Sequence, residues 1–117
     1  MSNYIKTAVG NERRVELHEK LALTGAEVTI NRLPAGDCVP FVHSHKQNEE
    51  IYGIISGKGK FVIDGESVEL NAGDWLKILP AAKRQIFAAP DSPITYICVQ
   101  AKQNSIEGFN ETDGIVY

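Results

Sequence analysis

The chain has 117 residues, a net charge of -3 and 43% apolar residues. This length is enough for one domain, and the apolar content excludes a disordered chain. Acidic and basic residues are spread along the sequence, so there is no electrostatic footprint for nucleic acid or for an anionic membrane. No run approaches the ~20 apolar residues that a bilayer span requires.

The two cysteines, Cys38 and Cys98, lie far apart in the sequence and do not form a disulfide framework. The N-terminal segment 1–6 lacks the apolar core of a signal peptide. We therefore expect a cytoplasmic protein in a reducing setting, in which both cysteines are small buried residues.

In chain order, the first twenty residues alternate only weakly. Val15 and Leu17 suggest a short strand, although residues 17–24 could instead form a helical turn. From Glu27 onward the sequence predicts strands separated by turn residues, and Asp64-Gly65 is a strong hairpin turn signal. The predicted strands are residues 27–33, 38–45, 50–55, 60–63, 67–70, 75–79, 85–89 and 94–101.

Short strands at a spacing of about 8 to 12 residues are typical of an all-β sandwich or barrel. The sequence shows no alternation of strands with long helices, so it does not favour a parallel sheet. The polar tail from Gln103 carries a few apolar residues that could dock elsewhere: Ile106, Phe109 and residues 115–117.

His43 and His45 are the residues most informative about function. They lie two residues apart in a predicted strand, so their imidazoles point to the same face. Glu50 follows five residues after His45, and a carboxylate returning on the next strand can complete the set. Two histidines and one carboxylate with open positions are a recognised way to hold a divalent transition metal ion.

Parity indicates that this site faces the interior. Phe41 shares the face of the two histidines, and Tyr52 and Ile54 share the face of Glu50. Polar groups in such a place are costly unless they are paired, and a bound cation would pair them. A hydrogen-bonded trio without a metal ion is the alternative.

These residues give the chain a resemblance to a single-domain cupin over residues 27 to 101. The first cupin motif consists of a glycine, two histidines separated by one residue, a glutamate and a second glycine. It is matched by Gly36, His43, His45, Glu50 and Gly57, with one residue more than usual between Gly36 and His43.

The second cupin motif is degraded in residues 80–85. Ala82 stands where the family has a glycine, and Gln85 stands where it has a histidine. Phe87 follows Gln85 at two residues, so we expect both to face inward. Lys83 and Arg84 are expected in a solvated turn near the barrel mouth, with attraction of a substrate carboxylate or phosphate as the alternative.

The resemblance implies an all-β, single-domain jelly-roll barrel that comprises residues 1–117. The barrel core is expected at about residues 27–101, with the N-terminal strand and the C-terminal tail packing on it or on a partner. The implied ion is zinc, manganese, iron, cobalt or nickel. The implied metal ligands are His43, His45, Glu50 and Gln85, although Gln85 could instead hydrogen-bond a water molecule or a substrate.

The expected function is that of a small metalloenzyme acting on a low-molecular-weight substrate, of the oxygenase, isomerase or decarboxylase type. Tyr52 is the candidate proton donor, with barrel packing as its alternative role. Two other functions stay open: a metal-containing binding module for sugars or small ligands without turnover, and a metal-free structural or sensing barrel. Small cupins usually pair, so we expect a homodimer, with residues such as 4–9 adding to the sheet of the partner.

Two further side chains carry predictions. His18 stands apart from the other histidines and is expected on the surface. Trp75 follows Gly73-Asp74 and is expected to pack, either within the domain or in a subunit interface.

Overall fold

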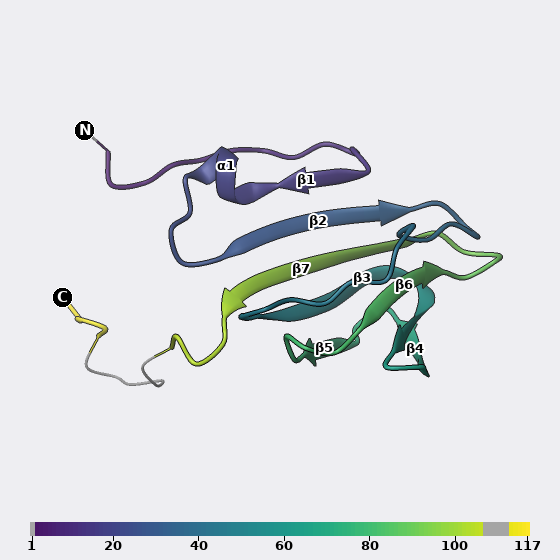
Figure 1. Ribbon diagram of the computed structural model, residues 1–117. Helices are drawn as coiled ribbons and strands as arrows, with labels where there is room; N and C mark the ends of the chain where they lie inside the picture. The colour runs from purple at the N-terminus through teal and green to yellow at the C-terminus, as the bar shows by residue number, and fades with distance from the viewer. Residues whose placement is uncertain (1, 107–112) are drawn as a thin grey trace.

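The computed structural model describes residues 2–106 and 113–117 (Figure 1). Phe109, one of the predicted docking residues, lies outside these ranges. In the described residues, no helix has the length and apolar character that a membrane span requires. The elements are β1 (Arg14–Glu16), α1 (Leu17–Leu21), β2 (Glu27–Leu33), β3 (Asn48–Ile63), β4 (Glu66–Asn71), β5 (Trp75–Ile78), β6 (Arg84–Ala88) and β7 (Ile94–Lys102).

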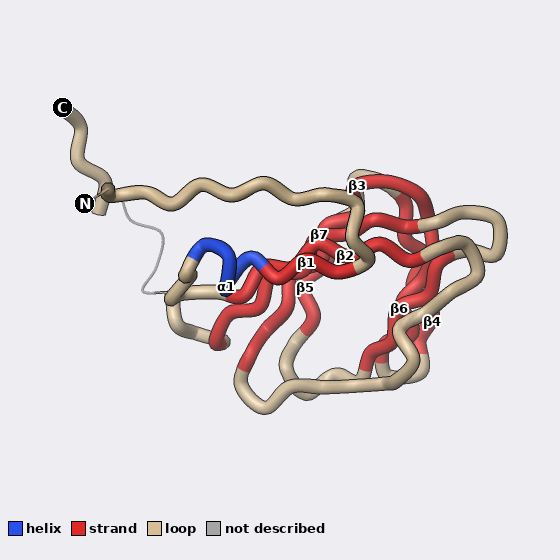
Figure 2. Tube along the Cα trace, turned by 90° about the horizontal axis from the view of Figure 1, so that it is seen from above, coloured by secondary structure: helices blue, strands red, loops and turns tan. Residues whose placement is uncertain are grey.

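The strands pair antiparallel in the order β1-β2-β7-β3-β4, and β5 and β6 also pair with β3. The long strand β3 connects the two halves of the fold. Its first half pairs with β7 and β5, and its second half pairs with β4 and β6. Figure 2 shows these two groups of strands on either side of an interior, with β4 and β6 facing β1 and β2. The prediction of an all-β fold is confirmed.

The predicted strand 27–33 coincides with β2, and both readings of the first twenty residues are realised. Val15 lies in β1, and the chain then turns into α1. The predicted strand 38–45 was wrong. It forms only single bridges, Cys38 to Phe87 and His43 to Arg84, because Pro40 has no backbone N–H for a continuous ladder.

The predicted break between strands 50–55 and 60–63 was also wrong. Residues 56–59 continue as part of β3, with a register shift between Ile54 and Ser56 where β3 pairs with β7. Gly57 has φ +77 at this bend, so it redirects the strand instead of ending it. As a result, one strand carries Glu50 at one end and Phe61 at the other.

Alternation along the strands places one set of side chains in the interior. Buried and less buried residues alternate in β6 and along most of β7. The apolar interior is formed by Leu33, Tyr52, Ile54, Phe61, Leu70, Ile78, Ile86, Ala88, Ile94, Tyr96 and Cys98. Four buried polar or charged residues share the interior, namely Thr29, Asn31, Glu50 and Arg84.

Gly57 gives a test of the bend in β3. A Cβ atom at this position would lie 1.8 Å from the carbonyl oxygen of Pro93, and φ is +77. We expect Gly57→Ala to lower the free energy of unfolding by about 3 kcal/mol or more. Gly65→Ala is the control, because Gly65 has φ +83 but open space around it, and it should cost only about 1 kcal/mol. Urea titration measures both values, and equal losses would contradict the close approach.

Trp75 packs as expected while 60% of its surface remains exposed. Its ring covers Gly53, where a Cβ atom would lie 2.3 Å from the indole carbons. The terminal segments carry other exposed apolar side chains: Tyr4, Ile5, Val9, Ile106 and Ile115–Tyr117. Figure 2 shows the N-terminal segment as an extended strap running outside the strands. Docking of these residues on a partner stays a prediction.

Candidate metal centre

The two histidines come from the connection between β2 and β3, and backbone hydrogen bonds hold that connection in place. His43 and Arg84 exchange N–H to carbonyl bonds of 3.1 and 2.9 Å. The backbone N–H of His45 donates to the carbonyl of Pro80 at 2.7 Å. These bonds, and not a regular strand, bring both imidazoles toward Glu50 on β3.

His43, His45 and Glu50 each offer one ligand atom to a common point, and these atoms all lie within 4.8 Å of one another. Nε2 of His43 is 3.7 Å from Oε1 of Glu50, and Nε2 of His45 is 3.3 Å from Oε2. Metal bonds of about 2.0–2.2 Å place two ligand atoms on one ion up to about 4.4 Å apart. The three predicted residues therefore converge at a spacing close to that of a metal site.

One nitrogen atom of this cluster supports the same interpretation. Nε2 of His45, the ring nitrogen that faces Glu50, is buried and has no hydrogen-bond partner in the described residues. Burial is the main cause that lowers the pKa of His43 below its ordinary value, so the ring is neutral near pH 7. Neutral imidazole has the lone pair that a metal ligand needs. The residues present fit a divalent cation.

Glu50 is only 2% exposed, and three side chains donate to its carboxylate. The Tyr52 hydroxyl donates to Oε1 at 2.8 Å, Nη1 of Arg84 donates to Oε1 at 3.2 Å, and the Cys98 thiol donates to Oε2 at 3.4 Å. Such partners fix the direction in which a metal-binding carboxylate points.

Arg84 is the residue that the sequence prediction misplaced. It is 0% exposed, and besides Glu50 its guanidinium donates to the carbonyl of Leu79. The expected solvated turn is wrong for Arg84 because β6 begins at this residue and its alternation places Arg84, Ile86 and Ala88 inward. Lys83 is exposed, as expected.

Gln85 and Phe87 therefore lie on the other face of β6 and not on the inward face that was predicted for them. Both residues are only partly buried. The amide nitrogen of Gln85 donates to the carbonyl of Val39 at 2.8 Å, and Gln85 lines the cavity in front of the cluster. Metal ligation by the Gln85 oxygen is not tested by these contacts and stays a prediction.

Tyr52 lies in the interior and bonds Glu50 directly. Burial is the largest cause that raises the pKa of its hydroxyl far above the ordinary value, and the neighbouring Cys98 and Glu50 add to it. The phenol therefore stays protonated and acts as a donor to Glu50. Its predicted role as a proton donor to substrate remains a prediction.

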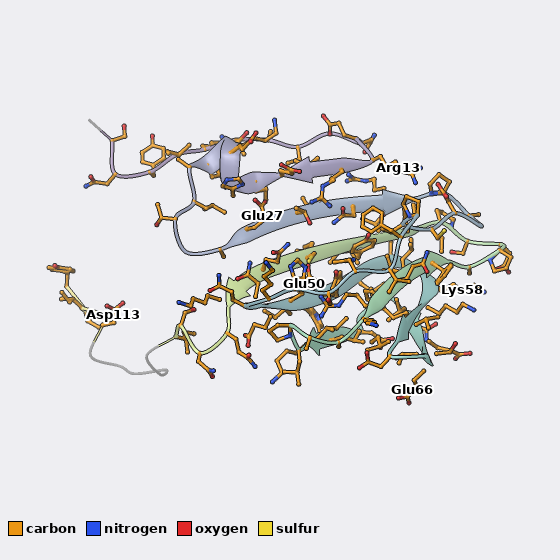
Figure 3. The ribbon with its side chains drawn as sticks, viewed as in Figure 1. Arg13, Glu27, Glu50, Lys58, Glu66 and Asp113 are labelled. Carbon is orange, nitrogen blue, oxygen red and sulfur yellow. The ribbon has the colours of Figure 1, made fainter. Side chains whose placement is uncertain are left out.

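A cavity of about 570 Å³ opens in front of these groups, a size suited to a small molecule. The metal-binding cluster lines one part of it, and Thr29, Asn31 and Arg14 line another. Phe41 lines the cavity, in agreement with the face it was predicted to share with the histidines, but it is more than half exposed and so lies at the rim and not in the core. Figure 3 shows Glu50 among the strands and Arg13 beside the start of β1.

His18 is half-exposed and pairs with Glu27, outside this cluster. Its predicted surface position is confirmed. It is the one histidine that does not line the cavity, which makes it a matched control for the other two.

Cys98 is predicted to be chemically inert although it touches the metal-binding cluster. Burial, followed by the charge of Glu50, raises the pKa of its thiol to about 12, so only about one molecule in ten thousand is thiolate at pH 8. We expect iodoacetamide to modify Cys98 at least about tenfold more slowly than the half-buried Cys38, as followed by peptide mass spectrometry. Faster modification of Cys98 would contradict this burial.

Comparison with known proteins agrees with this fold and site. A model of the cupin domain matches residues 29–100. The chain therefore belongs to the cupin family, and the predicted resemblance is confirmed.

A solved cupin protein from Bacteroides fragilis is 66% identical, with a TM-score of 0.96 over 100% of this chain and 99% of the other. A sugar phosphate isomerase of the cupin superfamily from Silicibacter pomeroyi is 21% identical, with a TM-score of 0.69, over 78% of this chain and 60% of the other. A DMSP lyase from Ruegeria pomeroyi is 22% identical, with a TM-score of 0.59, over 73% and 46%. The latter two show the fold alone.

An uncharacterised protein from Methanocaldococcus jannaschii is 33% identical over 57 residues. The match covers 49% of this chain and 46% of that protein, so the chain matches about half the length of this relative.

Proposed function

We propose that this cupin binds a divalent transition metal ion through His43, His45 and Glu50, with Gln85, which lines the same cavity, as the fourth protein ligand. The ion is zinc, manganese, iron, cobalt or nickel. The observation that carries the proposal is the convergence of three ligand atoms within 4.8 Å on a cavity, where Nε2 of His45 is buried without a hydrogen-bond partner. A cation is the natural partner for that nitrogen and the nearby carboxylate.

The proposed activity is that of a small metalloenzyme acting on a low-molecular-weight substrate in this cavity. A bound ion would supply Lewis-acid or redox chemistry. Glu50 is held for that purpose by Tyr52, Arg84 and Cys98, and the two histidines are left partly exposed to the cavity. The isomerase and the lyase among the distant structures indicate two reaction types to test besides oxygenation and decarboxylation.

A binding module without turnover is the second candidate. It is favoured by Tyr52, because a phenol with a strongly raised pKa that already donates to Glu50 is a weak proton source for a substrate. Tyr52→Phe separates the two roles. A loss of turnover with unchanged metal affinity would support proton transfer, whereas a weaker metal affinity would support positioning of Glu50.

The test of the proposed function begins with the metal content of the purified protein, measured by inductively coupled plasma mass spectrometry. One ion per chain is expected, and it should be removed by a chelator and restored by adding the metal. Turnover and oxygen uptake are then screened with small enediols, sugars and keto acids. Ligand-induced thermal shifts without turnover would support the binding module, and a protein that takes up no metal would overturn both.

We also propose that the protein is a cytoplasmic homodimer, in which both free cysteines stay reduced. The exposed Tyr4, Ile5 and Val9 on the extended N-terminal segment support pairing. So does β1, which among the described strands pairs with β2 alone. Light scattering after size exclusion is expected to give twice the chain mass. Removal of residues 2–11 should give a folded monomer, and a monomeric full chain would contradict the proposal.

A further inference from the structure

A second polar wall of the cavity lies on β2, two strands away from Glu50 in the same sheet. Thr29 and Asn31 are 3% and 6% exposed and both line the cavity. Nη1 of Arg14 donates to Oδ1 of Asn31 at 3.1 Å, and Nδ2 of Asn31 donates to Oγ1 of Thr29 at 2.9 Å. Every hydrogen bond runs in the same direction, and the Thr29 hydroxyl hydrogen has no acceptor in the described residues. The chain of bonds therefore ends in a buried donor.

Tyr96 adds a second donor to this wall. It pairs with Asn31 in the β2–β7 register, it is buried, and it lines the cavity. Its hydroxyl forms no hydrogen bond in the part of the chain that the structure describes, and it is not among the side-chain atoms that are shut off from solvent without a partner. It is therefore free to donate to a ligand or a water molecule in the cavity.

The cavity lining offers a guanidinium N–H group to an anion. The charged residues of the lining are Arg13, Arg14 and Glu50, and each is paired with an opposite charge, Glu50 with Arg84. Arg13 pairs with Asp37 at 2.6 Å, and Nε of Arg14 pairs with Glu16 at 3.2 Å. These contacts leave Nη2 of Arg14 without a protein partner in the described residues. A guanidinium beside hydroxyl and amide donors is a typical oxyanion site.

The register gives the distance between the two walls. β7 lies between β2 and β3, and Thr29 and Tyr52 are both partners of Cys98 across that strand. Neighbouring strands are about 4.8 Å apart, so the β2 wall and the β3 side of the cavity are about 10 Å apart. A molecule that touches both walls is short and has a polar group at each end.

We propose that Arg14, Asn31, Thr29 and Tyr96 form an anion subsite that binds the carboxylate or phosphate group of a short-chain organic anion, the other end of which reaches the metal centre. This identifies the substrate class of the proposed enzyme, and the position of the second end rests on that proposed function. The subsite itself uses only residues of β1, β2 and β7.

The test is isothermal titration calorimetry of the full chain, with and without bound metal, using three probes. L-malate and glycerol 3-phosphate present a carboxylate and a phosphate, and 1,2,4-butanetriol has the malate skeleton without charge. We expect one of the two anions to bind at least about tenfold more tightly than the triol, and the stronger anion identifies the group that the subsite prefers. Equal affinities for all three probes would overturn the proposal.

Variants locate the effect. Arg14→Gln should lower the anion affinity at least about fivefold, and Thr29→Val should lower it as well, with unchanged metal content in both. Arg32→Gln is the matched control, because Arg32 also lies on the β1–β2 side but donates to the carbonyl of Glu12 and does not line the cavity. Equal effects of Arg14→Gln and Arg32→Gln would overturn the subsite.

Metal content separates this proposal from the proposed function. If the protein binds metal but shows no preference for the anions, the proposed subsite is overturned and the proposed metal centre stands. If the protein takes up no metal, the proposed function is overturned. The anion preference of the metal-free protein then tests the subsite by itself. Circular dichroism and the thermal midpoint confirm folding, and the exposed Arg14 position keeps the test valid if Thr29→Val does not fold.

Discussion

Replacement of His43 or His45 by alanine is expected to lower the affinity for a divalent metal ion by at least about 100-fold. Each substitution removes one of the three ligand atoms that lie within 4.8 Å of one another, and loss of a supporting group alone commonly costs 10–100-fold. Competition with a chromophoric chelator measures the affinity, and plasma mass spectrometry measures the metal content.

His18→Ala is the control for this experiment. It removes the same side chain from a half-exposed position beside Glu27, so it reports any non-specific effect of losing an imidazole. We expect its metal affinity to equal that of the unmodified chain. A similar loss in all three variants, or in none of them, would show that the ion binds elsewhere.

The second large effect is expected from Arg84→Leu, which should destabilise the metal-free protein by about 3–5 kcal/mol. Arg84 and Glu50 are 0% and 2% exposed, and removal of one partner leaves an uncompensated charge in the interior. Urea titration of the chelator-treated protein measures the loss. A change below about 1 kcal/mol would show that the pair does not hold Glu50 in place.

A double variant and added metal test the reason for that loss. Arg84→Leu combined with Glu50→Gln removes both charges, so it should be more stable than Arg84→Leu alone. A metal ion should stabilise Arg84→Leu more than the unmodified chain, because the ion replaces the guanidinium as the positive charge beside Glu50. Equal stabilisation would mean that the ion and Arg84 do not interact with the same carboxylate.

The cluster could be predicted from the sequence because its spacing is short and local. The histidines lie two residues apart, and Glu50 follows within five residues near the start of the next strand. Few chain conformations can hold these three side chains far from one another. The predicted strand around them was wrong, but bonds from Arg84 and Pro80 hold His43 and His45 in an equivalent orientation. Here tertiary hydrogen bonds replaced the regular strand.

The orientation of β6 could not be predicted from its own residues. Arg84 shares one face of the strand with Ile86, and Gln85 shares the other face with Phe87. Each face carries one polar and one apolar residue, so the sequence pattern does not show which face points inward. The pairing of Phe61 with Ile86 decides between them, and that register depends on β3, where Gly57 and Gly59 indicated a turn that does not form. The error for Arg84 therefore followed from the error in β3.

The polar wall on β2 had a signal in the sequence that was not interpreted. The strand 27–33 was predicted with the bounds that the structure shows, and Thr29 and Asn31 alternate with Val28 and Ile30 along it. Two of the three buried residues of this strand are polar, and a ligand cavity carries a small number of such polar groups on an otherwise apolar lining. Which side faces inward depends on the pairing with β7, which a single sequence does not contain.

The most direct test of the metal centre is a crystal structure of the purified protein with anomalous diffraction data collected at the absorption edges of manganese, iron, cobalt, nickel and zinc. The account predicts one strong peak per chain, at bonding distance of about 2.0–2.2 Å from a nitrogen of His43, a nitrogen of His45 and an oxygen of Glu50. Clear density for these three side chains without a peak between them, after crystallisation with added metal, would contradict it.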